Sequence, residues 1–356
     1  MTPLESRIAA LRDPAAGLSL AETGARIRAA AADGHAAVAI TLGYPAASWH
    51  DALQAQVAQA VGEEGLQLAS LELQHRIDAH APQGELVPLP RIRNVIAVGS
   101  GKGGVGKSTT AVNLALALAG EGARVGVLDA DVYGPSIPTM LGLTGRPDSP
   151  DGKAIEPMRA HGIDAMSIGL MVEQDTPMIW RGPMATSALT QLLEQTLWGS
   201  DGQLDYLIVD LPPGTGDIQL TLAQKIPVAG AVVVTTPQDV ATLDARKALR
   251  MFEKVNVPVL GLVENMAVHV CSNCGHVEHL FGHGGGERIA AQYHVPLLGS
   301  LPLDIGIREQ GDAGTPIVAS APESAVAVAY RATARRMAAE LARRPKARVS
   351  LGAQLL

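Results

Sequence analysis

Aromatic side chains are scarce in this chain of 356 residues, which contains only two Phe, three Trp and five Tyr. Hydrophobic residues nevertheless make up 47% of the sequence. The core must therefore be built from Ala, Val, Leu and Ile, which is typical of buried parallel sheets covered by helices. The length allows one large α/β domain together with a smaller domain.

Cysteine, positive charge and long apolar runs are also in short supply. The chain has two Cys and no leader-like N-terminus, so we expect a cytoplasmic protein whose thiols stay reduced. The formal net charge of −7 argues against a general attraction to nucleic acid or anionic lipid. No segment approaches the length of a membrane span. We therefore expect neither nucleic acid nor membrane as a partner.

A basic cluster near the C-terminus is the exception to this acidic balance. It comprises Arg335, Arg336, Arg343, Arg344, Lys346 and Arg348. Cations in the last turn of a helix interact favourably with the negative end of its dipole. We therefore predict a solvated helix end here rather than a binding surface.

Residues 1–80 are expected to form a small α+β domain. Its predicted elements are a helix over 4–11, a strand over 37–42, a helix over 47–61 and a strand over 66–77. The stretch 78–90 contains three prolines and a glycine, which indicates a linker. We place this linker at residues 81–93.

Strands and helices alternate over the following domain, which we place at residues 94–345, before a tail over 346–356. The predicted strands cover 95–98, 125–128, 207–209, 232–235, 259–263 and 297–301. The clearest helices between them cover 184–198 and 240–254. This alternation predicts an α/β fold, with a mostly parallel sheet and helices on both faces. Ligands of such sheets bind at the carboxyl ends of the strands.

A glycine-rich segment follows the first of these strands and precedes a helical run over 109–118. Its residues are Gly101, Lys102, Gly103, Gly104, Val105, Gly106, Lys107, Ser108 and Thr109. The pattern G-x-x-x-x-G-K-S is that of a P-loop, whose backbone N–H groups surround phosphates. Lys107 is expected to reach the β- and γ-phosphates of a nucleotide, and Ser108 to bind Mg²⁺. Lys102 is a further cation that a single nucleotide does not require.

Polar residues follow three of the predicted strands. Asp129 and Asp131 lie two apart at a strand end and should point the same way, one serving the Mg²⁺ shell and one orienting an attacking water. Helix capping is the alternative for either residue. Asp210 ends a strand in the Walker B pattern and should hold a Mg²⁺-bound water, and Gly214 lets its N–H approach a γ-phosphate. The amide of Asn265 suits a purine edge, although closing a turn is the alternative.

The only two cysteines, Cys271 and Cys274, form a C-x-x-C-G motif. Two thiolates at this spacing can hold one metal centre, whereas zinc sites and [4Fe–4S] clusters prefer four ligands. His276 and His279 could complete a zinc site within one chain. Alternatively, two chains could each contribute two thiolates to a centre on a symmetry axis. The sequence leaves both solutions open.

Several segments, in the expected order, resemble the Mrp/ApbC family of iron–sulfur cluster carrier ATPases, which are relatives of MinD, ParA and the nitrogenase iron protein. They cover 101–108, 129–136, 180–184, 210–217 and 263–266, within a resemblance over residues 90–345. The resemblance implies a MinD-like P-loop ATPase that hydrolyses ATP slowly with Mg²⁺. It also implies carriage of a labile [4Fe–4S] cluster from a donor to apo-proteins.

The resemblance further implies a homodimer, in which the C-x-x-C motifs of two chains bridge the cluster. Lys102 resembles the signature lysine that reaches the partner's ATP, and Asp131 resembles the water-orienting carboxylate of switch I. The segment 210–217 resembles switch II, and Asn265 resembles the adenine contact. The expected catalytic residues are Lys102, Lys107, Asp131 and Asp210, and the expected magnesium shell is Ser108, Asp129 and Asp210.

The first 80 residues resemble the small domain that accompanies iron–sulfur assembly factors, through Asp13-Pro14 and the segment 41–45. Many relatives have a cysteine before the proline of that segment, where this chain has Tyr44. We therefore expect a docking or structural role for this domain rather than a thiol-based one.

Two other functions are compatible with a P-loop. A positioning or partitioning ATPase of the MinD/ParA type would need a membrane-targeting helix or a DNA-binding surface, and it leaves Cys271 and Cys274 without a role. A biosynthetic enzyme that phosphorylates a small carboxylate or amine would need a substrate pocket that the sequence does not reveal.

Overall fold

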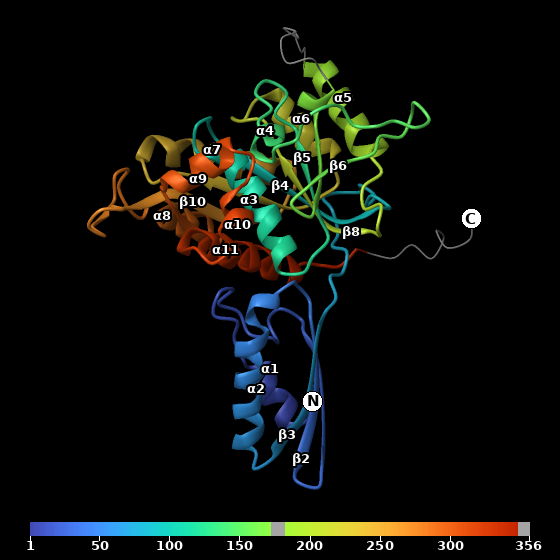
Figure 1. Ribbon diagram of the computed structural model, residues 1–356, viewed down its shortest axis with the longest axis vertical. Helices are drawn as coiled ribbons and strands as arrows, with labels where there is room; N and C mark the ends of the chain where they lie inside the picture. The colour runs from blue at the N-terminus through green and yellow to red at the C-terminus, as the bar shows by residue number, and fades with distance from the viewer. Residues whose placement is uncertain (172–181, 348–356) are drawn as a thin grey trace.

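The computed structural model describes residues 1–171 and 182–347, which form two domains (Figure 1). The small domain contains α1 (Pro3–Ala9), β1 (Arg26–Ala32), β2 (His35–Leu42), the 3-10 turn η1 (Ala47–Trp49), α2 (His50–Glu63) and β3 (Gln67–His75). β1 and β2 pair antiparallel, whereas β2 and β3 pair parallel. Asp33 and Gly34 both have positive φ, as the tight turn between β1 and β2 requires. The predicted elements of this domain are confirmed, and β1 adds a third strand.

The sheet of the small domain is packed on one face only. Along β2, alternate residues from Ala36 to Leu42 are buried, whereas those between them are exposed or half-buried. This period of two is that of a strand with one wet face. Leu53, Val57 and Val61 of α2 are buried in the same core, as their four-residue spacing predicts.

The large domain is built on one sheet in the order β11-β10-β9-β4-β8-β5-β7-β6, with β12 beside β10. The strands are β4 (Ile92–Ser100), β5 (Val125–Asp129), β6 (Met158–Ala160), β7 (Ile163–Ser167), β8 (Leu204–Asp210), β9 (Val228–Thr235), β10 (Val259–Val270), β11 (Val277–Glu278) and β12 (Leu297–Pro302). Among these described strands only the pairs β6–β7 and β10–β11 are antiparallel. The predicted mostly parallel sheet is therefore confirmed.

Helices cover both faces of this sheet. They are α3 (Lys107–Gly120), α4 (Ile137–Met140), α5 (Gly182–Gln195), α6 (Asp217–Lys225), α7 (Asp239–Lys254), α8 (Gly285–Tyr293), α9 (Ile305–Asp312), α10 (Ile317–Ser320) and α11 (Ala325–Ala342). Ile96 and Val98 of β4 pack into a core with α3 and α11, whereas Val95 and Ala97 face α6 and α7. A strand buried on both faces reads as a continuous apolar run, which explains why the central strands were visible in the sequence.

Several observed bounds differ from the predicted ones. β4 begins at Ile92, inside the predicted linker, and α5 ends at Gln195, before the predicted end at Trp198. β10 continues to Val270, and the short β6 and β7 were not predicted. Sheet hydrogen bonds extend or create these elements, and local sequence pattern does not record them. Trp180, Arg181 and the tail from residue 348 lie outside the described residues.

The connection between the domains is partly fixed to the large domain. The buried amide of Gln83 donates to the carbonyls of Ala223 and Ile226, both at 2.7 Å, and accepts the N–H of Val228 at 2.8 Å. Gln83 lies within the predicted linker, so this part of the linker is fixed to the large domain by hydrogen bonds. None of the described helices is long and apolar enough to span a bilayer.

One member of the basic cluster is buried between the domains. Arg335 of α11 is 7% exposed and forms an ion pair with Asp13 of the small domain. Its guanidinium lies 5.8 Å from the ring centroid of Trp49, and the Tyr44 hydroxyl donates to the other oxygen of Asp13 at 2.9 Å. The predicted solvated helix end is therefore wrong for Arg335, because this side of α11 packs against the small domain.

Candidate nucleotide and metal sites

The P-loop lies between β4 and α3, at the carboxyl end of the central strand. Gly106 has a φ of +79°, and a Cβ built on it would lie 2.2 Å from the Nδ2 atom of Asn265. A Cβ on Gly101 would lie 2.0 Å from the backbone oxygen of Asp244. Only glycine fits these two positions, which keeps the loop backbone close to its neighbours.

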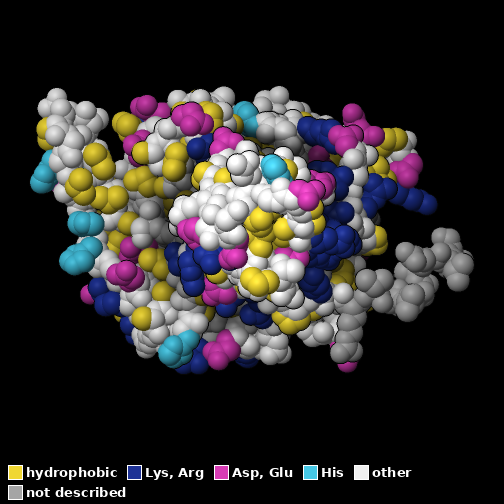
Figure 2. Space-filling model, turned by 90° about the horizontal axis from the view of Figure 1, so that it is seen from below, with side chains coloured by type: hydrophobic (Ala, Val, Ile, Leu, Met, Phe, Trp, Pro, Cys, Tyr) yellow, Lys and Arg dark blue, Asp and Glu magenta, His cyan; other side chains and the backbone are white. Residues whose placement is uncertain are grey.

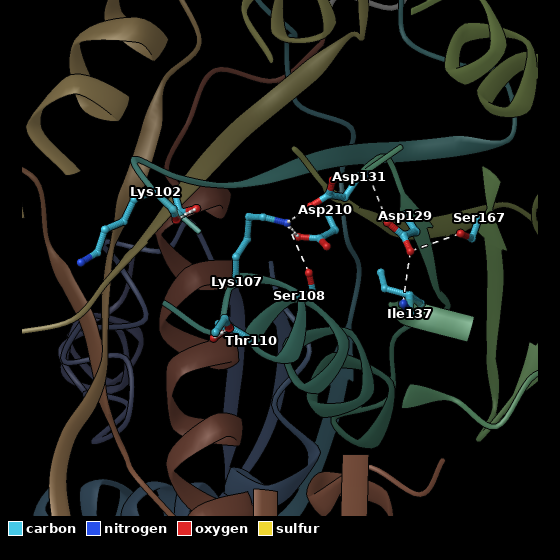
Figure 3. A network of polar contacts seen from close by, with 11 residues as sticks. Lys102, Lys107, Ser108, Thr110, Asp129, Asp131, Ile137, Ser167 and Asp210 are labelled. Atoms are coloured by element: carbon cyan, nitrogen blue, oxygen red, sulfur yellow. Dashed lines mark hydrogen bonds and ion pairs between the residues drawn. The ribbon is translucent and has the colours of Figure 1, made fainter. Parts of the chain in front are cut away.

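Lys107, the first residue of α3, lies in a buried cluster of charges (Figure 3). Its Nζ donates to Oδ1 of Asp210 at 2.7 Å and to the hydroxyl of Ser108 at 3.3 Å, and it lies 3.8 Å from Oδ2 of Asp131. Burial raises the pKa of Asp210, and the adjacent Lys107 ammonium opposes this rise. The structure thus brings together four residues that the sequence predicted for phosphate and Mg²⁺ chemistry.

Asp129 and Asp131 point to different partners, contrary to the expectation that they would point the same way. Asp129 accepts the backbone N–H groups of Asp131 at 3.1 Å and Ile137 at 3.2 Å, and the Ser167 hydroxyl at 3.2 Å (Figure 3). β5 ends at Asp129, so Asp131 lies beyond the strand, where the two-residue period no longer applies. Burial, together with the charge of Asp210, raises the pKa of Asp129 to about 7.

Lys102 belongs to the P-loop, and Gly214 follows β8. The Lys102 side chain points away from the Lys107 cluster (Figure 3), and it is half-buried. Gly214, with a φ of +92°, donates its N–H to the Ser100 carbonyl at 3.1 Å. For this N–H to bind a γ-phosphate, its hydrogen bond to the Ser100 carbonyl would have to break.

Asn265 lies on β10 and is buried beside the P-loop, where it donates to the Val105 carbonyl at 2.9 Å. Next to it is a mainly apolar pocket of about 210 Å³. Its lining includes Gly106, Met140, Met266, Leu303 and Ile307. Sequence reasoning missed the contribution of residues 302–304. They follow the predicted strand 297–301, so the rule that ligands bind at carboxyl strand ends could have found them.

The two cysteines lie in the turn between β10 and β11, which projects from the large domain (Figure 1, orange). Cys271 donates its N–H to the His276 carbonyl at 2.9 Å, and Gly275 returns its N–H to the Cys271 carbonyl at 2.8 Å with a φ of +72°. Hydrogen bonds from the backbone of Cys274 and Asn273 lower the pKa of the Cys271 thiol. A lowered pKa favours the thiolate form of Cys271, which is the form that binds a metal.

The neighbouring histidines do not complete a zinc site in the described part of the chain. His276 Nε2 lies 3.9 Å from a Glu278 oxygen, and His279 Nδ1 lies 3.0 Å from the Ala267 carbonyl. Nowhere in residues 1–171 and 182–347 do three or more His, Cys, Asp or Glu gather as a metal site would require. Cys274 is exposed, and so are the nearby apolar side chains of Val270, Val277 and Leu280.

The chain is similar to known proteins over most of its length. Residues 91–338 match the family described as NUBPL iron-transfer P-loop NTPase, and residues 4–66 match the iron–sulfur cluster assembly protein family. The iron–sulfur cluster carrier protein of Escherichia coli strain K12 is 57% identical over 298 residues, which are 82% of this chain and 80% of that protein.

Two solved structures show the same architecture. The nucleotide-binding protein of Archaeoglobus fulgidus in complex with ADP is 40% identical with a TM-score of 0.56, over 63% of this chain and 87% of that one. The cell division ATPase MinD of Pyrococcus furiosus is 23% identical with a TM-score of 0.51, over 68% of this chain and 98% of that one. The predicted MinD-like fold is confirmed.

Proposed function

We propose that this chain, which belongs to the NUBPL iron-transfer P-loop NTPase family, is an ATP-dependent carrier that binds an iron–sulfur cluster and transfers it to apo-proteins. The observation that carries the proposal is the exposed Cys271–Cys274 turn, which presents two thiols and no further ligand among the described residues. A cluster held so openly is suited to transfer rather than to permanent storage.

A second copy of the chain supplies the missing ligands in this proposal. Two C-x-x-C turns facing each other across a two-fold axis provide the four thiolates that a [4Fe–4S] cluster prefers. Val270, Val277 and Leu280 are about half exposed around the turn, and association of two copies would cover them. Lys102 extends away from its own P-loop cluster and would reach the partner's nucleotide.

ATP and Mg²⁺ occupy the P-loop site in this proposal. Lys107 binds the phosphates, and the adenine enters the pocket beside Asn265. Ser108 and Asp210 fit a Mg²⁺ shell, since the Oδ2 atom of Asp210 is buried without a hydrogen-bond partner in the described structure. When bound there, Mg²⁺ would supply charge neutralisation at the phosphates. Asp131, 3.8 Å from Lys107, positions the attacking water, and the Asp129 carboxylate holds the loop that carries Asp131.

One strand connects the two sites. β10 carries Asn265 at the nucleotide pocket and, after an irregularity at Met266 (φ +55°), continues to Val270, the residue before Cys271. A shift of the strand end on ATP binding or hydrolysis would therefore move the cysteine turn directly. Coupling of nucleotide turnover to cluster release follows from this short path along one element.

Anaerobic reconstitution with iron and sulfide tests the proposal. We expect a brown protein with broad visible absorption, about one cluster per two chains, and loss of this absorption in Cys271→Ser. Ser272→Ala, in the same turn, is the matched control and should keep the cluster. A colourless protein with one zinc ion per chain would refute cluster carriage. A MinD/ParA-type positioning role gains no support, because it leaves the cysteine turn without a use.

A further inference from the structure

Cationic side chains gather at one side of the junction between the two domains, although the whole chain is acidic (Figure 2). We name them the junction cations, and they are Arg26, Arg28, Arg76, Arg93, Arg124 and Lys346. A hollow of about 620 Å³ opens among Arg76, Arg93 and Arg124. Arg76 also borders a second, smaller hollow with Arg26 and Lys346. The basic surface is therefore continuous from the small domain to the large one.

Asp78 neutralises only part of this charge. It forms ion pairs with Lys346, with Arg76 at 3.6 Å and with Arg26 at 3.8 Å. The three cations remain more than half exposed, whereas the Asp78 side chain is 24% exposed. One largely covered carboxylate thus holds three outward-facing cations in place, which reduces the side-chain entropy that they would lose on binding a partner.

On the large-domain side, Asp205 pairs with junction cations as Asp78 does. It pairs with Arg93 and lies 4.0 Å from Arg124, and its side chain is 8% exposed. Arg28 is exposed on β1 and has no ion pair among the described residues. Glu72 is the exposed carboxylate of the adjoining sheet face. The surface therefore keeps a clear excess of positive charge after its internal pairs are formed.

The sheet face beside these cations is open and made of small side chains. Ala30, Ala37, Ala39 and Ser70 lie on it, and Arg28 pairs across the β1–β2 ladder with Ala39. Short side chains let another chain approach the sheet closely. Arginine is among the residues that are enriched at protein interfaces.

The composition of this face favours a protein partner over a nucleic acid. The small domain has only two aromatic side chains, Tyr44 and Trp49, and both are buried. Single-stranded nucleic acid is bound through stacking on exposed aromatic rings, which this face does not offer. The net charge of −7 also opposes a polyanion at long range, whereas a short acidic segment meets mainly the local cations.

We propose that the junction cations and the open sheet face dock a carboxylate-rich segment of a partner protein. Arg28 and Arg76 make the principal contacts, because a guanidinium binds a carboxylate with two parallel hydrogen bonds. The chain's own residues 348–356 contain no Asp or Glu, so they lack this chemistry. Docking here is independent of the cysteine turn and of ATP, and it gives the small domain a use that needs no thiol.

A fluorescent peptide of alternating Glu and Thr is the probe, titrated against the full-length protein at low and physiological salt. We expect saturable binding that weakens with salt, and at least about a tenfold loss of affinity in Arg28→Glu/Arg76→Glu. The matched control is Lys153→Glu/Arg250→Glu, which changes net charge equally on exposed positions away from the junction and should bind like the wild type. Thermal unfolding, ATP hydrolysis and cluster content are measured on both variants. Both variants should fold, with small losses of stability because Arg76 and Arg250 each lose an ion pair. ATP hydrolysis and cluster content should be unchanged.

Three results would overturn the proposal. They are equal affinity in the two double variants, absence of saturable binding at low salt, and preference for single-stranded RNA or phosphatidylserine vesicles over the peptide. Because ATP hydrolysis and cluster content are measured on the same samples, a failure of peptide docking is distinguishable from a failure of cluster carriage.

Discussion

The P-loop cluster and the cysteine turn meet their chemical needs in opposite ways. Lys107, Asp131 and Asp210 are buried and already paired within one chain. Cys271 and Cys274 lie at the surface, with two ligands where a cluster prefers four. Buried charges must be paired inside the fold, because an unpaired buried charge is destabilising. Exposed thiols need no partner within the same chain, and a second chain can supply the remaining ligands. Stability measurements should therefore separate the two regions sharply.

Removing the buried cation should have the largest effect on stability. Lys107→Ala leaves Asp210 buried without its partner at 2.7 Å, and we expect a loss of about 3–5 kcal/mol in the free energy of unfolding. ATP hydrolysis should fall by at least about 100-fold, because a charge that stabilises the phosphates is gone. Urea unfolding and phosphate release are the measurements. Cluster binding without ATP should persist, and its loss would argue against separate sites.

Asp129 makes the stability of the buried region depend on pH. Its pKa is raised from an ordinary 3.8 to about 7, so the folded chain holds this proton more tightly than the unfolded chain. This contribution is fully present below pH 3.8 and declines as pH rises through about 7. Wild type should therefore lose about 3 kcal/mol relative to Asp129→Asn between pH 4.5 and 7.5. The unfolding free energies of wild type and Asp129→Asn are measured against pH, and parallel curves for the two proteins would contradict this prediction.

Asn265→Ala should have a smaller effect. The change removes the hydrogen bond to the Val105 carbonyl, and we expect a loss of about 1–2 kcal/mol in stability. Affinity for ADP should also weaken, since the same amide borders the apolar pocket. Isothermal titration with ADP and with inorganic triphosphate checks this. An equal loss for both ligands would place the effect at the phosphates and not at the base.

Cys274→Ser should change stability least, by no more than about 0.5 kcal/mol, because the side chain is exposed. Cluster binding should nevertheless be abolished. Urea unfolding of the cluster-free protein, compared with iron content after reconstitution, shows both. A large loss of stability in the cluster-free variant would mean that the turn is part of the folded core, and the contrast between the two regions would fail.

The P-loop could be found in the sequence because its signals are local. Glycines at 101 and 106, the lysine and the strand before them lie within one short segment, and each has a required backbone or charge. The pocket contribution of residues 302–304 was missed, because these residues are remote in sequence from the P-loop. The divergence of Asp129 and Asp131 was missed too, because it depends on where β5 ends.

Local pattern thus sufficed for the parallel sheet, the P-loop and the paired thiols, since side-chain period and residue spacing are written along the chain itself. Only the tertiary structure shows that Arg335 is buried against Asp13 and that Gln83 is hydrogen-bonded to the large domain. It also shows that one strand runs from Asn265 to the residue before Cys271. These contacts link residues far apart along the chain or depend on how far a strand extends. The packing of helices and sheets decides them, and no stretch of sequence read alone records that packing.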